Sequence, residues 1–540
     1  MPEGSEGRSP SATGLNGKSG KFDPRNLDKS LISLPLLNEM GSVAPSERLD
    51  VIIDLNLNWP GDRAEVRQFV TALINEIAGD GAIYELKTRC SHQYVFASLT
   101  PKEIIELAHA DLARHRGADA DMGSAPKRAI HRIWFDHDIE EQTNRSISTV
   151  KADAARSAFG ALGENIVWAV LDTGIDGQHP HFQLHETLNV NAPLRHRDFT
   201  SLEDEHAPGS GGVRHGALID EAGHGTHVAG IIAGEFEAGL PGRTLSNGQP
   251  ADHPGTIVST IYRFQEDGTQ RSDEDVARTG KMTGMAPRAK ILSLKVLDAK
   301  GGGKASNIIA ALEYIHELNS QGRLLLVHGV NLSVGYGFDP AWFACGQSPV
   351  CVEVNRLVNS GVVVVAAAGN TGYGFNQPAS AGPRAAGLDI TINDPGNAEL
   401  AITVGATHRD APHLYGISYF SSKGPTGDGR SKPDLVAPGE KILSCHSGDK
   451  KGAKATFVGE QHGNTSIQVE VSRYIEDSGT SMAAPHVSGV IAAFLSVRRE
   501  FIGQPHRVKE LFMSTATDLN RAVYFQGRGL VDLMRAIQAV

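Results

Sequence analysis

The chain has 540 residues, of which 40% are hydrophobic and 21% charged. This globular composition supplies enough apolar material for a large core and for roughly two to four domains. The formal net charge of −11 excludes the basic balance that is typical of nucleic-acid-binding proteins. We find neither an apolar run of about 18 residues, which would predict a membrane span, nor a secretory signal in the first residues, MPEGSEGRSPSATG. We therefore expect a cytoplasmic protein that binds neither nucleic acid nor membrane.

The first quarter of the chain predicts a disordered lead and a small α+β domain. Residues 1–46 are rich in Gly, Ser, Pro and charge, which favours disorder, with one short apolar patch at Leu31–Leu34. The elements expected next are strands at Leu49–Leu57, Ala82–Lys87, Tyr94–Leu99 and Ile130–Phe135, an amphipathic helix at Arg63–Ala78 and a helix opening at Thr100. Their order, β-α-β-β-α-β, predicts a ferredoxin-like domain over residues 47–138.

From residue 139 to residue 540, apolar runs of strand length alternate with helical segments. The expected strands are Asn165–Leu171, Lys290–Leu297, Leu324–Leu332, Val362–Ala368 and Leu400–Val404, and the expected helices include His227–Ala233, Ala305–Asn319 and Cys351–Asn359. This alternation predicts a doubly wound, mostly parallel α/β sheet, in which sites form at the carboxyl ends of strands. Asp172 and Asn370 follow two of these strands, whereas His224 and Ser481 stand where helices begin. We expect all four side chains at one edge of the sheet.

Two polar stretches interrupt the alternation of strands and helices. Glu235–Lys281 predicts a surface insertion. Ser444–Asp477 predicts a second insertion, with a hairpin formed by Ala455–Val458 and Ile467–Val471. Neither stretch carries a motif that indicates a site.

The cysteines do not predict a disulfide-stabilised fold. Four cysteines are too few for a disulfide framework in a chain of this length. Cys345 and Cys351 are either reduced thiols, as the expected compartment favours, or the two ends of a small loop staple.

The stretch GTSMAAPHVSG around Ser481 is where we expect the chemistry of the chain to centre. Small residues followed by the apolar segment VSGVIAAFLSV predict a buried helix, and Pro485 is compatible with its first turn. Ser481 would then lie at the positive end of the helix dipole. A hydroxyl is well placed there as a nucleophile, and the neighbouring backbone N–H groups can receive an oxyanion. The alternative is a serine that only caps the helix.

Two further motifs decide between these alternatives. The DTG motif that begins at Asp172 ends the first strand of the sheet, and the GHGTHVAG motif places His224 at a glycine-rich helix start. A zinc site at His224 and His227 is not favoured, because no carboxylate motif accompanies the pair. Each motif is weak alone, but the order Asp…His…Ser is that of the subtilisin triad and differs from that of chymotrypsin-like and α/β-hydrolase enzymes.

On these motifs the chain resembles the subtilisin-like serine peptidases (family S8) over about residues 140–540. Further family-like segments are Met285–Pro287, Lys432–Gly439 and Gly527–Asp532. The domain at 47–138 looks like the inhibitor-type propeptide of this family, which assists folding and covers the active site. The resemblance implies a serine endopeptidase that hydrolyses proteins through an acyl-enzyme. Its partners would be polypeptide substrates and its own prodomain, an intramolecular inhibitor released by processing between Asp136 and Asn144.

The resemblance and the chemistry of the triad together imply a role for each residue. Ser481 attacks the scissile carbonyl, and His224 takes its proton and later protonates the leaving amine. Asp172 orients the imidazole and stabilises the imidazolium. Asn370, in the segment AAAGN, corresponds to the oxyanion-hole side chain of the family and acts with the backbone N–H of Ser481.

The substrate is expected to bind as an added strand, which makes cleavage tolerant of sequence. The resemblance implies two flanking backbone edges, one formed by Gly301, Gly302 and Gly303 and the other by Ser333, Val334 and Gly335. Glycine suits a backbone that another backbone must approach closely. The alternative for the three glycines is a flexible loop. Asn393 falls near the floor of the first specificity pocket, where many relatives have Gly, and it predicts a smaller or more polar pocket.

No cofactor is required by this pattern, although it is compatible with calcium. The tight calcium site of the family uses an Asp directly after the His-Pro of the first motif, and here His181 follows His179-Pro180. The later ligand loop of that site is replaced by the 235–281 insertion. Asp434 corresponds to a weaker cation site of the family.

Two other functions are compatible with parts of the sequence. The first is a catalytically silent interaction protein that keeps the subtilase fold, which the complete triad opposes. The second is an esterase of the α/β-hydrolase type. It is opposed by the order of the triad and by the lack of Gly-x-Ser-x-Gly at Ser481.

Overall fold

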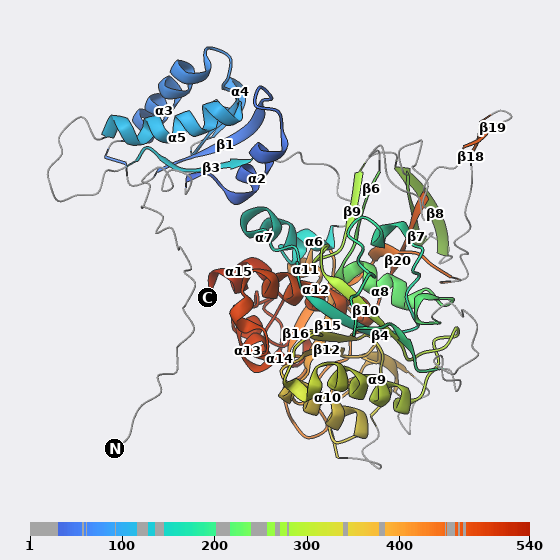
Figure 1. The fold of residues 1–540 in the computed structure, drawn as a ribbon. Helices are drawn as coiled ribbons and strands as arrows, with labels where there is room; N and C mark the ends of the chain where they lie inside the picture. The colour runs from blue at the N-terminus through green and yellow to red at the C-terminus, as the bar shows by residue number, and fades with distance from the viewer. Residues whose placement is uncertain are drawn as a thin grey trace, which may run out of the picture. The chain divides into compact units, whose positions relative to one another are not determined.

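A computed structural model describes most of the chain. The described residues are 31–56, 59–60, 62–91, 93–115, 128–135, 145–200, 216–238, 256–264, 270–277, 280–338, 344–376, 384–448, 450, 460–462, 465–467 and 471–540. The chain divides into two compact units, Met1–Asp138 and Ile139–Val540, and in Figure 1 the colour of the first runs from blue to cyan. The segment between Asp136 and Asn144, where we expect processing, lies outside the described residues.

The first unit is an antiparallel sheet covered by helices. Its strand order is β2-β1-β3, with β1 at Leu49–Leu55, β2 at Tyr94–Leu99 and β3 at Ile130–Phe135. Residues of β1 are alternately buried and half-buried, as expected for a strand with one face on a core. Helices α3 (Arg63–Ala78) and α5 (Pro101–His115) each begin with a capping box, formed by Asp62 with Glu65 and by Thr100 with Glu103.

Two expectations for the first unit are wrong. Residues 82–87 do not form a full strand, since Ile83 makes a single bridge to Ala97 and the helix α4 (Glu85–Cys90) follows directly. The described part of the lead is not disordered, because α2 (Leu34–Ser42) follows residues that pack into the core of this unit. Leu31, Ile32 and Leu36 are buried there. The prediction of disorder followed the polar composition of the whole segment, which conceals these few apolar residues.

The second unit is built on a parallel sheet with the strand order β16-β15-β12-β11-β4-β10-β5. The strands are β4 (Val167–Asp172), β5 (Arg197–Asp198), β10 (Lys290–Lys295), β11 (Gly329–Leu332), β12 (Val363–Ala367), β15 (Ile402–His408) and β16 (Leu435–Glu440). Every neighbouring pair is parallel. Successive residues of β4 pack into two different hydrophobic cores. Trp168 and Val170 belong to one core, and Ala169 and Leu171 belong to the other.

Helices cover both faces of this sheet. Helices α8 (His224–Ile232) and α12 (Thr480–Val497) share one core, and α9 (Ala305–Leu318) and α10 (Pro349–Asn359) share the other. Figure 1 shows the two pairs on opposite faces. The predicted doubly wound parallel α/β fold is therefore confirmed. Helix α12 is apolar enough over its 18 residues to cross a membrane, but 83% of it is buried, as expected for a central core helix.

The second unit also contains further helices and a hairpin. They are helices α6 (Ser146–Thr149), α7 (Ala152–Phe159), α11 (Pro412–Tyr415), α13 (Pro505–Thr515), α14 (Val523–Gln526) and α15 (Leu533–Gln538), and the hairpin of β13 (Tyr373–Asn376) with β14 (Arg384–Gly387). Cys345 and Cys351 are buried free thiols, so they do not form a loop staple in this structure.

The two predicted insertions are not separate, because they contribute to one sheet. Its strand order is β17-β20-β7-β8, with β7 at Thr256–Phe264, β8 at Gln270–Ala277, β17 at Ile442–Cys445 and β20 at Val471–Asp477. Strands β6 (Glu235–Ala238) and β9 (Gly280–Thr283) pair at the base of the first insertion. The second insertion has a hairpin of β18 (Glu460–His462) with β19 (Thr465–Ile467). Of the predicted hairpin, Ile467 belongs to β19 and Val471 to β20, whereas residues 455–458 and 468–470 lie outside the described residues.

Candidate active site

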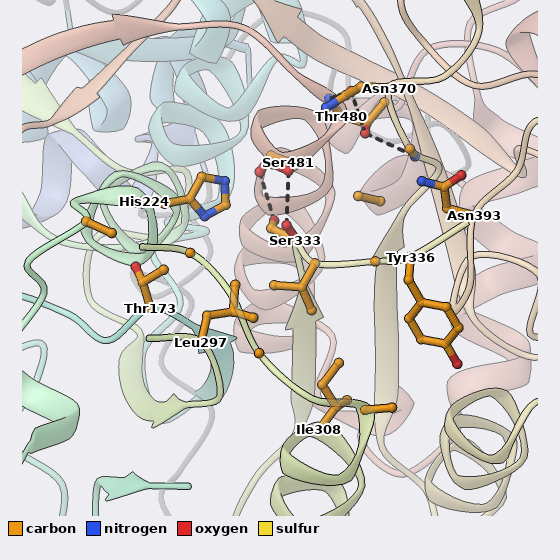
Figure 2. Close-up of a pocket in the computed structure, with 18 of the residues that line it drawn as sticks. Thr173, His224, Leu297, Ile308, Ser333, Tyr336, Asn370, Asn393, Thr480 and Ser481 are labelled. Carbon is orange, nitrogen blue, oxygen red and sulfur yellow. Dashed lines mark hydrogen bonds between the residues drawn. The ribbon is translucent and has the colours of Figure 1, made fainter. Parts of the chain in front are cut away.

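A pocket lies at the carboxyl ends of the parallel strands in the second unit. Its lining comes from the residue after β4, the start of α8, the loop after β10, the ends of β11 and β12, and the first turn of α12. The lining residues that matter for the predicted site are Thr173, His224, Gly301, Gly303, Ser333, Val334, Gly335, Asn370, Asn393, Thr480 and Ser481. Figure 2 shows the side chains of His224, Ser333 and Thr480 near Ser481 in this pocket.

Ser481 is held in the first turn of α12 by two hydrogen bonds to Ser333. The Ser481 hydroxyl donates to the carbonyl oxygen of Ser333 over 3.0 Å, and the Ser333 hydroxyl donates to the carbonyl oxygen of Ser481 over 2.8 Å. Asn331 donates to the Ser333 hydroxyl over 2.8 Å and accepts a hydrogen bond from Ser488 over 2.9 Å. This buried polar chain ties the start of α12 to the end of β11.

His224 and Asp172 form the tightest polar contact of the site. Nδ1 of His224 lies 2.7 Å from Oδ1 of Asp172, which also accepts the backbone N–H of Thr173 over 2.8 Å. The carboxylate is buried at 1% exposure, whereas 28% of the imidazole is exposed toward the pocket. Because a carboxylate can only accept, the proton of this hydrogen bond is on Nδ1, which leaves Nε2 as the ring nitrogen that can accept a proton.

The glycines around His224 permit this contact. A Cβ at Gly225 would lie 2.1 Å from the carbonyl oxygen of Gly174 and 3.1 Å from Cβ of Asp172. Only glycine therefore lets the start of α8 approach the end of β4 so closely. The second glycine of GHG follows from this backbone packing, whereas Gly223 is required by its φ of +76° and by the carbonyl oxygen of Ser447, which would lie 2.0 Å from a Cβ.

Ser481 and His224, between which a proton is expected to pass, are not hydrogen-bonded to each other in this structure. The Ser481 hydroxyl donates instead to Ser333, as the dashed lines in Figure 2 mark, although the His224 ring lines the same pocket. A serine hydroxyl changes partner by rotating about a single bond. Catalytic hydrogen bonds are often loose in unliganded sites and tighten when substrate binds.

Asn370 is oriented by its contacts with Thr480. Its Oδ1 accepts the backbone N–H of Thr480 over 2.9 Å and the Thr480 hydroxyl over 3.0 Å. A backbone N–H needs an acceptor, so this pairing assigns the oxygen of the amide and leaves Nδ2 as the outer group. In Figure 2, Asn370 and His224 lie on opposite sides of Ser481.

Most of the predicted substrate edges line the pocket, with one exception. Gly301, Gly303 and the segment Ser333–Gly335 line it, and Gly302 does not. Gly302 turns back onto Asp298, donating its N–H to the carboxylate over 2.9 Å and accepting the Asp298 N–H over 2.7 Å. The three glycines are therefore not a uniform edge, because the middle one closes a turn.

Asn393 lines the same pocket as Ser481 and lies close to Gly369 and Gly335. A Cβ at Gly369 would lie 2.7 Å from Cγ and Nδ2 of Asn393, and a Cβ at Gly335 would lie 3.7 Å from its Cβ. The Thr371 hydroxyl donates to Oδ1 of Asn393 over 3.2 Å. The side chain thus occupies space that a glycine would leave open.

The residues do not fit a cation at Asp434. Its Oδ2 accepts from Nζ of Lys432 over 2.6 Å and from the N–H of Thr403 over 2.8 Å, and Nζ of Lys509 lies 3.2 Å from Oδ1. Burial works to raise the pKa of Asp434, but the two ammonium groups outweigh it and lower the pKa. Both oxygens of the carboxylate are therefore already paired with lysine side chains.

His181, which stands where the family has a calcium ligand, is buried and bound to protein. Its Nδ1 lies 3.1 Å from the Tyr474 hydroxyl. Burial, with the neighbouring His179 as a second cause, lowers the pKa of His181 to about 3. Within the described ranges, no group of three or more His, Cys, Asp or Glu side chains is arranged to hold a metal ion.

Comparison with known proteins identifies the family. The family model described as "Subtilase family" matches residues 163–529, about two thirds of the chain. The chain belongs to the subtilase family. Asp172, His224, Asn370 and Ser481 all fall inside the matched segment, whereas the first unit, Met1–Asp138, falls outside it.

Individual subtilases show the same relationship. The chain is 32% identical to pyrolysin of Pyrococcus furiosus over 345 residues, which cover 59% of this chain and 21% of pyrolysin. It is 28% identical to subtilisin E of Bacillus subtilis over 402 residues, 74% of this chain and 73% of that protein. It is 26% identical to the serine protease AprX of Bacillus subtilis over 396 residues, 72% and 70% of the two chains. This subtilase is a subtilisin-like serine endopeptidase, and neither the α/β-hydrolase esterase nor the silent interaction protein is favoured.

Sequence reasoning missed several polar residues that support the site. Asn331 and Thr480 contact the residues discussed above, and Asp220 is a third, buried at 4% exposure near His224. Asp220 precedes the GHGTH motif by only a few residues, but an Asp in a loop has many local uses. Only the hydrogen bonds that Asp220 accepts in the folded chain distinguish it from an ordinary loop aspartate.

Proposed function

We propose that Ser481, His224, Asp172 and Asn370 carry out peptide-bond hydrolysis in this endopeptidase. The observation that carries the proposal is the 2.7 Å contact between Asp172 and His224 at the wall of a pocket that also contains Ser481 and Asn370. With Nδ1 donating to Asp172, Nε2 of His224 is the nitrogen left to accept a proton, as a general base requires.

The reaction begins when substrate enters and the Ser481 hydroxyl turns from Ser333 toward Nε2 of His224. The hydroxyl oxygen attacks the scissile carbonyl carbon while its proton passes to Nε2. Buried Asp172 stabilises the resulting imidazolium, which then protonates the leaving amine. An acyl-enzyme on Ser481 remains. Water, deprotonated by the same imidazole, hydrolyses this ester and releases the acid product.

The oxyanion of each tetrahedral intermediate is bound by Nδ2 of Asn370 and by the backbone N–H of Ser481. Thr480 orients Asn370 by donating twice to Oδ1. This fixes Nδ2 as the donor before substrate arrives, and such preorganisation lowers the reorganisation cost in the transition state. First-turn N–H groups of a helix have no intrahelical partner, so the Ser481 N–H is available.

The substrate backbone runs between the edge at Gly301 and Gly303 and the edge at Ser333–Gly335. Main-chain pairing of this kind supports cleavage of varied polypeptides. We propose that Asn393 restricts the residue before the scissile bond to small or polar side chains, since its amide fills the recess. Cleavage of a peptide library tests this, and a preference for large aromatic residues would contradict it.

We also propose that the first unit is a self-inhibiting propeptide. Support comes from its independent compactness, its position before the subtilase segment, and its α+β order. Processing between Asp136 and Asn144 would release it.

A comparison of wild type with Ser481→Ala tests both proposals. The two full chains are incubated with casein, their N-termini are determined by mass spectrometry, and a fluorophosphonate probe is applied. We expect wild type to lose the first unit, degrade casein and bind the probe, and Ser481→Ala to do none of these. An active wild type that starts at Met1 would rule out obligatory processing. A wild type that ignores both casein and probe would rule out the catalytic proposal.

A further inference from the structure

The carboxylate of Asp220 is surrounded by hydrogen-bond donors. Its Oδ1 accepts from the Thr173 hydroxyl over 2.8 Å and from the Gly223 N–H over 2.8 Å. Its Oδ2 accepts from the N–H and the hydroxyl of Thr226, over 2.8 and 2.6 Å. Only 4% of the residue is exposed. A buried carboxylate needs such compensation, since an unpaired one is strongly destabilising.

These donors belong to two segments that carry predicted triad residues. Thr173 directly follows Asp172, whereas Gly223 and Thr226 flank His224 in sequence. Asp220 therefore binds both sides of the Asp172–His224 contact without belonging to it. Its position ahead of helix α8 also places negative charge near the positive end of the helix dipole.

The two threonine hydroxyls extend this link by accepting further backbone N–H groups. The Thr173 hydroxyl accepts from Gly225 over 2.9 Å, and the Thr226 hydroxyl accepts from Asp176 over 2.9 Å. Each hydroxyl thus connects the loop after β4 to the start of α8, and both donate to the same carboxylate. The result is a closed network between the two segments with Asp220 at its centre.

We infer that Asp220 is a positioning residue that sets the geometry of Asp172 and His224. The inference rests on the proposed function of these two residues. Asp220 does not line the pocket, so it acts through the segments that it joins. Loss of this link would let the start of α8 move relative to the end of β4. A displacement of about 1 Å near reacting groups can lower the rate about 100-fold.

An amide cannot replace the carboxylate in this network. The N–H groups of Gly223 and Thr226 approach different oxygens of Asp220, and neither N–H can become an acceptor. In Asp220→Asn, one of them would face the amide NH₂ group. The substitution keeps the shape of the side chain but replaces one of these two hydrogen bonds by an unfavourable contact between two donors.

The test compares Asp220→Asn with Asp532→Asn in the full chain. Asp532 is a matched control because its carboxylate is 2% exposed and caps a helix, accepting the N–H of Arg535 over 3.0 Å, and because it does not line the pocket. Rates are measured on a short chromogenic peptide and normalised to the active sites titrated by fluorophosphonate. We expect Asp220→Asn to lower kcat about 100-fold with KM changed less than about twofold, and Asp532→Asn to lower Tm with kcat unchanged.

A double variant separates positioning from a general structural role. If Asp220 acts through His224, adding Asp220→Asn to His224→Ala changes the residual rate less than about twofold, because groups that act as a unit are not additive. A further large loss in that background would overturn the inference. An Asp220→Asn enzyme with the kcat of wild type would also overturn it.

A proton NMR measurement tests the positioning role independently of the proposed function. The proton shared by Nδ1 of His224 and Asp172 should give a low-field resonance in the full chain, assigned by its loss in His224→Ala. We expect the resonance to shift or broaden in Asp220→Asn and to persist in Asp532→Asn. A wild type without hydrolysis would end the catalytic proposal, whereas an unchanged resonance in Asp220→Asn would end the positioning role alone.

Discussion

Replacing Gly225 by alanine should separate the Asp172–His224 pair with little effect on the substrate edges. The new Cβ would lie 2.1 Å from the carbonyl oxygen of Gly174 and 3.1 Å from Cβ of Asp172. A carbon and a carbonyl oxygen need about 3.2 Å, so the two backbones must separate by roughly 1 Å. Neither contact is with a flexible side chain, so the segments themselves must move.

The expected loss follows from this displacement. His224 precedes Gly225 directly, so a shift of about 1 Å is passed to the imidazole and should lower kcat about 100-fold. Overpacking of this kind should also lower the free energy of unfolding by about 1–3 kcal/mol. KM should change little, because Gly301, Gly303 and Ser333 belong to other segments.

The assay is hydrolysis of a chromogenic peptide by titrated enzyme, with Tm measured in parallel. Gly337→Ala is the matched control, since a Cβ there would meet no atom within 4 Å and the glycine has no strained backbone conformation. We expect this control to match wild type in kcat and Tm. Retention of more than a third of the wild-type kcat by Gly225→Ala would refute the reasoning, whatever the change in Tm.

Four further outcomes are expected. Asn370→Ala should lower kcat by about 10²–10³, or roughly 2.7–4 kcal/mol, in peptide hydrolysis with KM nearly constant; an unchanged kcat would exclude its oxyanion role. Asn393→Gly should shift library cleavage toward larger residues before the scissile bond, and an unchanged profile would remove Asn393 from that subsite. Asp434 should not bind calcium, because two lysines are paired with its carboxylate. Any change of Tm on adding EDTA or calcium should therefore be the same in wild type and in Asp434→Asn. A calcium-dependent rise in Tm that Asp434→Asn abolishes would contradict this. His181, with its pKa lowered to about 3 by burial, should make the chain less stable as pH falls from about 6.5 toward 3. In that range the unfolded state binds a proton that the folded state does not, which corresponds to about 1.4 kcal/mol per pH unit. Urea unfolding of wild type and His181→Gln at pH 7 and pH 5 checks this, and equal pH dependence in both chains would contradict it.

The sequence by itself determined the fold class and the chemistry of the family. Residues 165–171 are almost entirely apolar because a parallel strand is buried on both faces, and the structure confirms this for β4. The motifs around Asp172, His224 and Ser481 are short, so their residue types and order are readable without coordinates. Gly225 is readable in the same way as a residue type, but the contact that requires a glycine there, with Gly174, joins two segments that are distant in sequence.

Tertiary structure alone decided the features that depend on partners distant in sequence. Residues 256–260 and 471–475 pair as neighbouring strands although more than two hundred residues separate them, so two predicted insertions became one sheet. Lys509 reaches Asp434 from helix α13, and no periodicity encodes that contact.

The same reason applies at the active site. The sequence shows Asp220 as an ordinary loop residue, whereas folding surrounds its carboxylate with donors from the segments of Asp172 and His224. The Ser481 hydroxyl donates to Ser333 because β11 ends beside the first turn of α12. Local patterns specify which residues can react, and long-range packing decides which groups hold them in place.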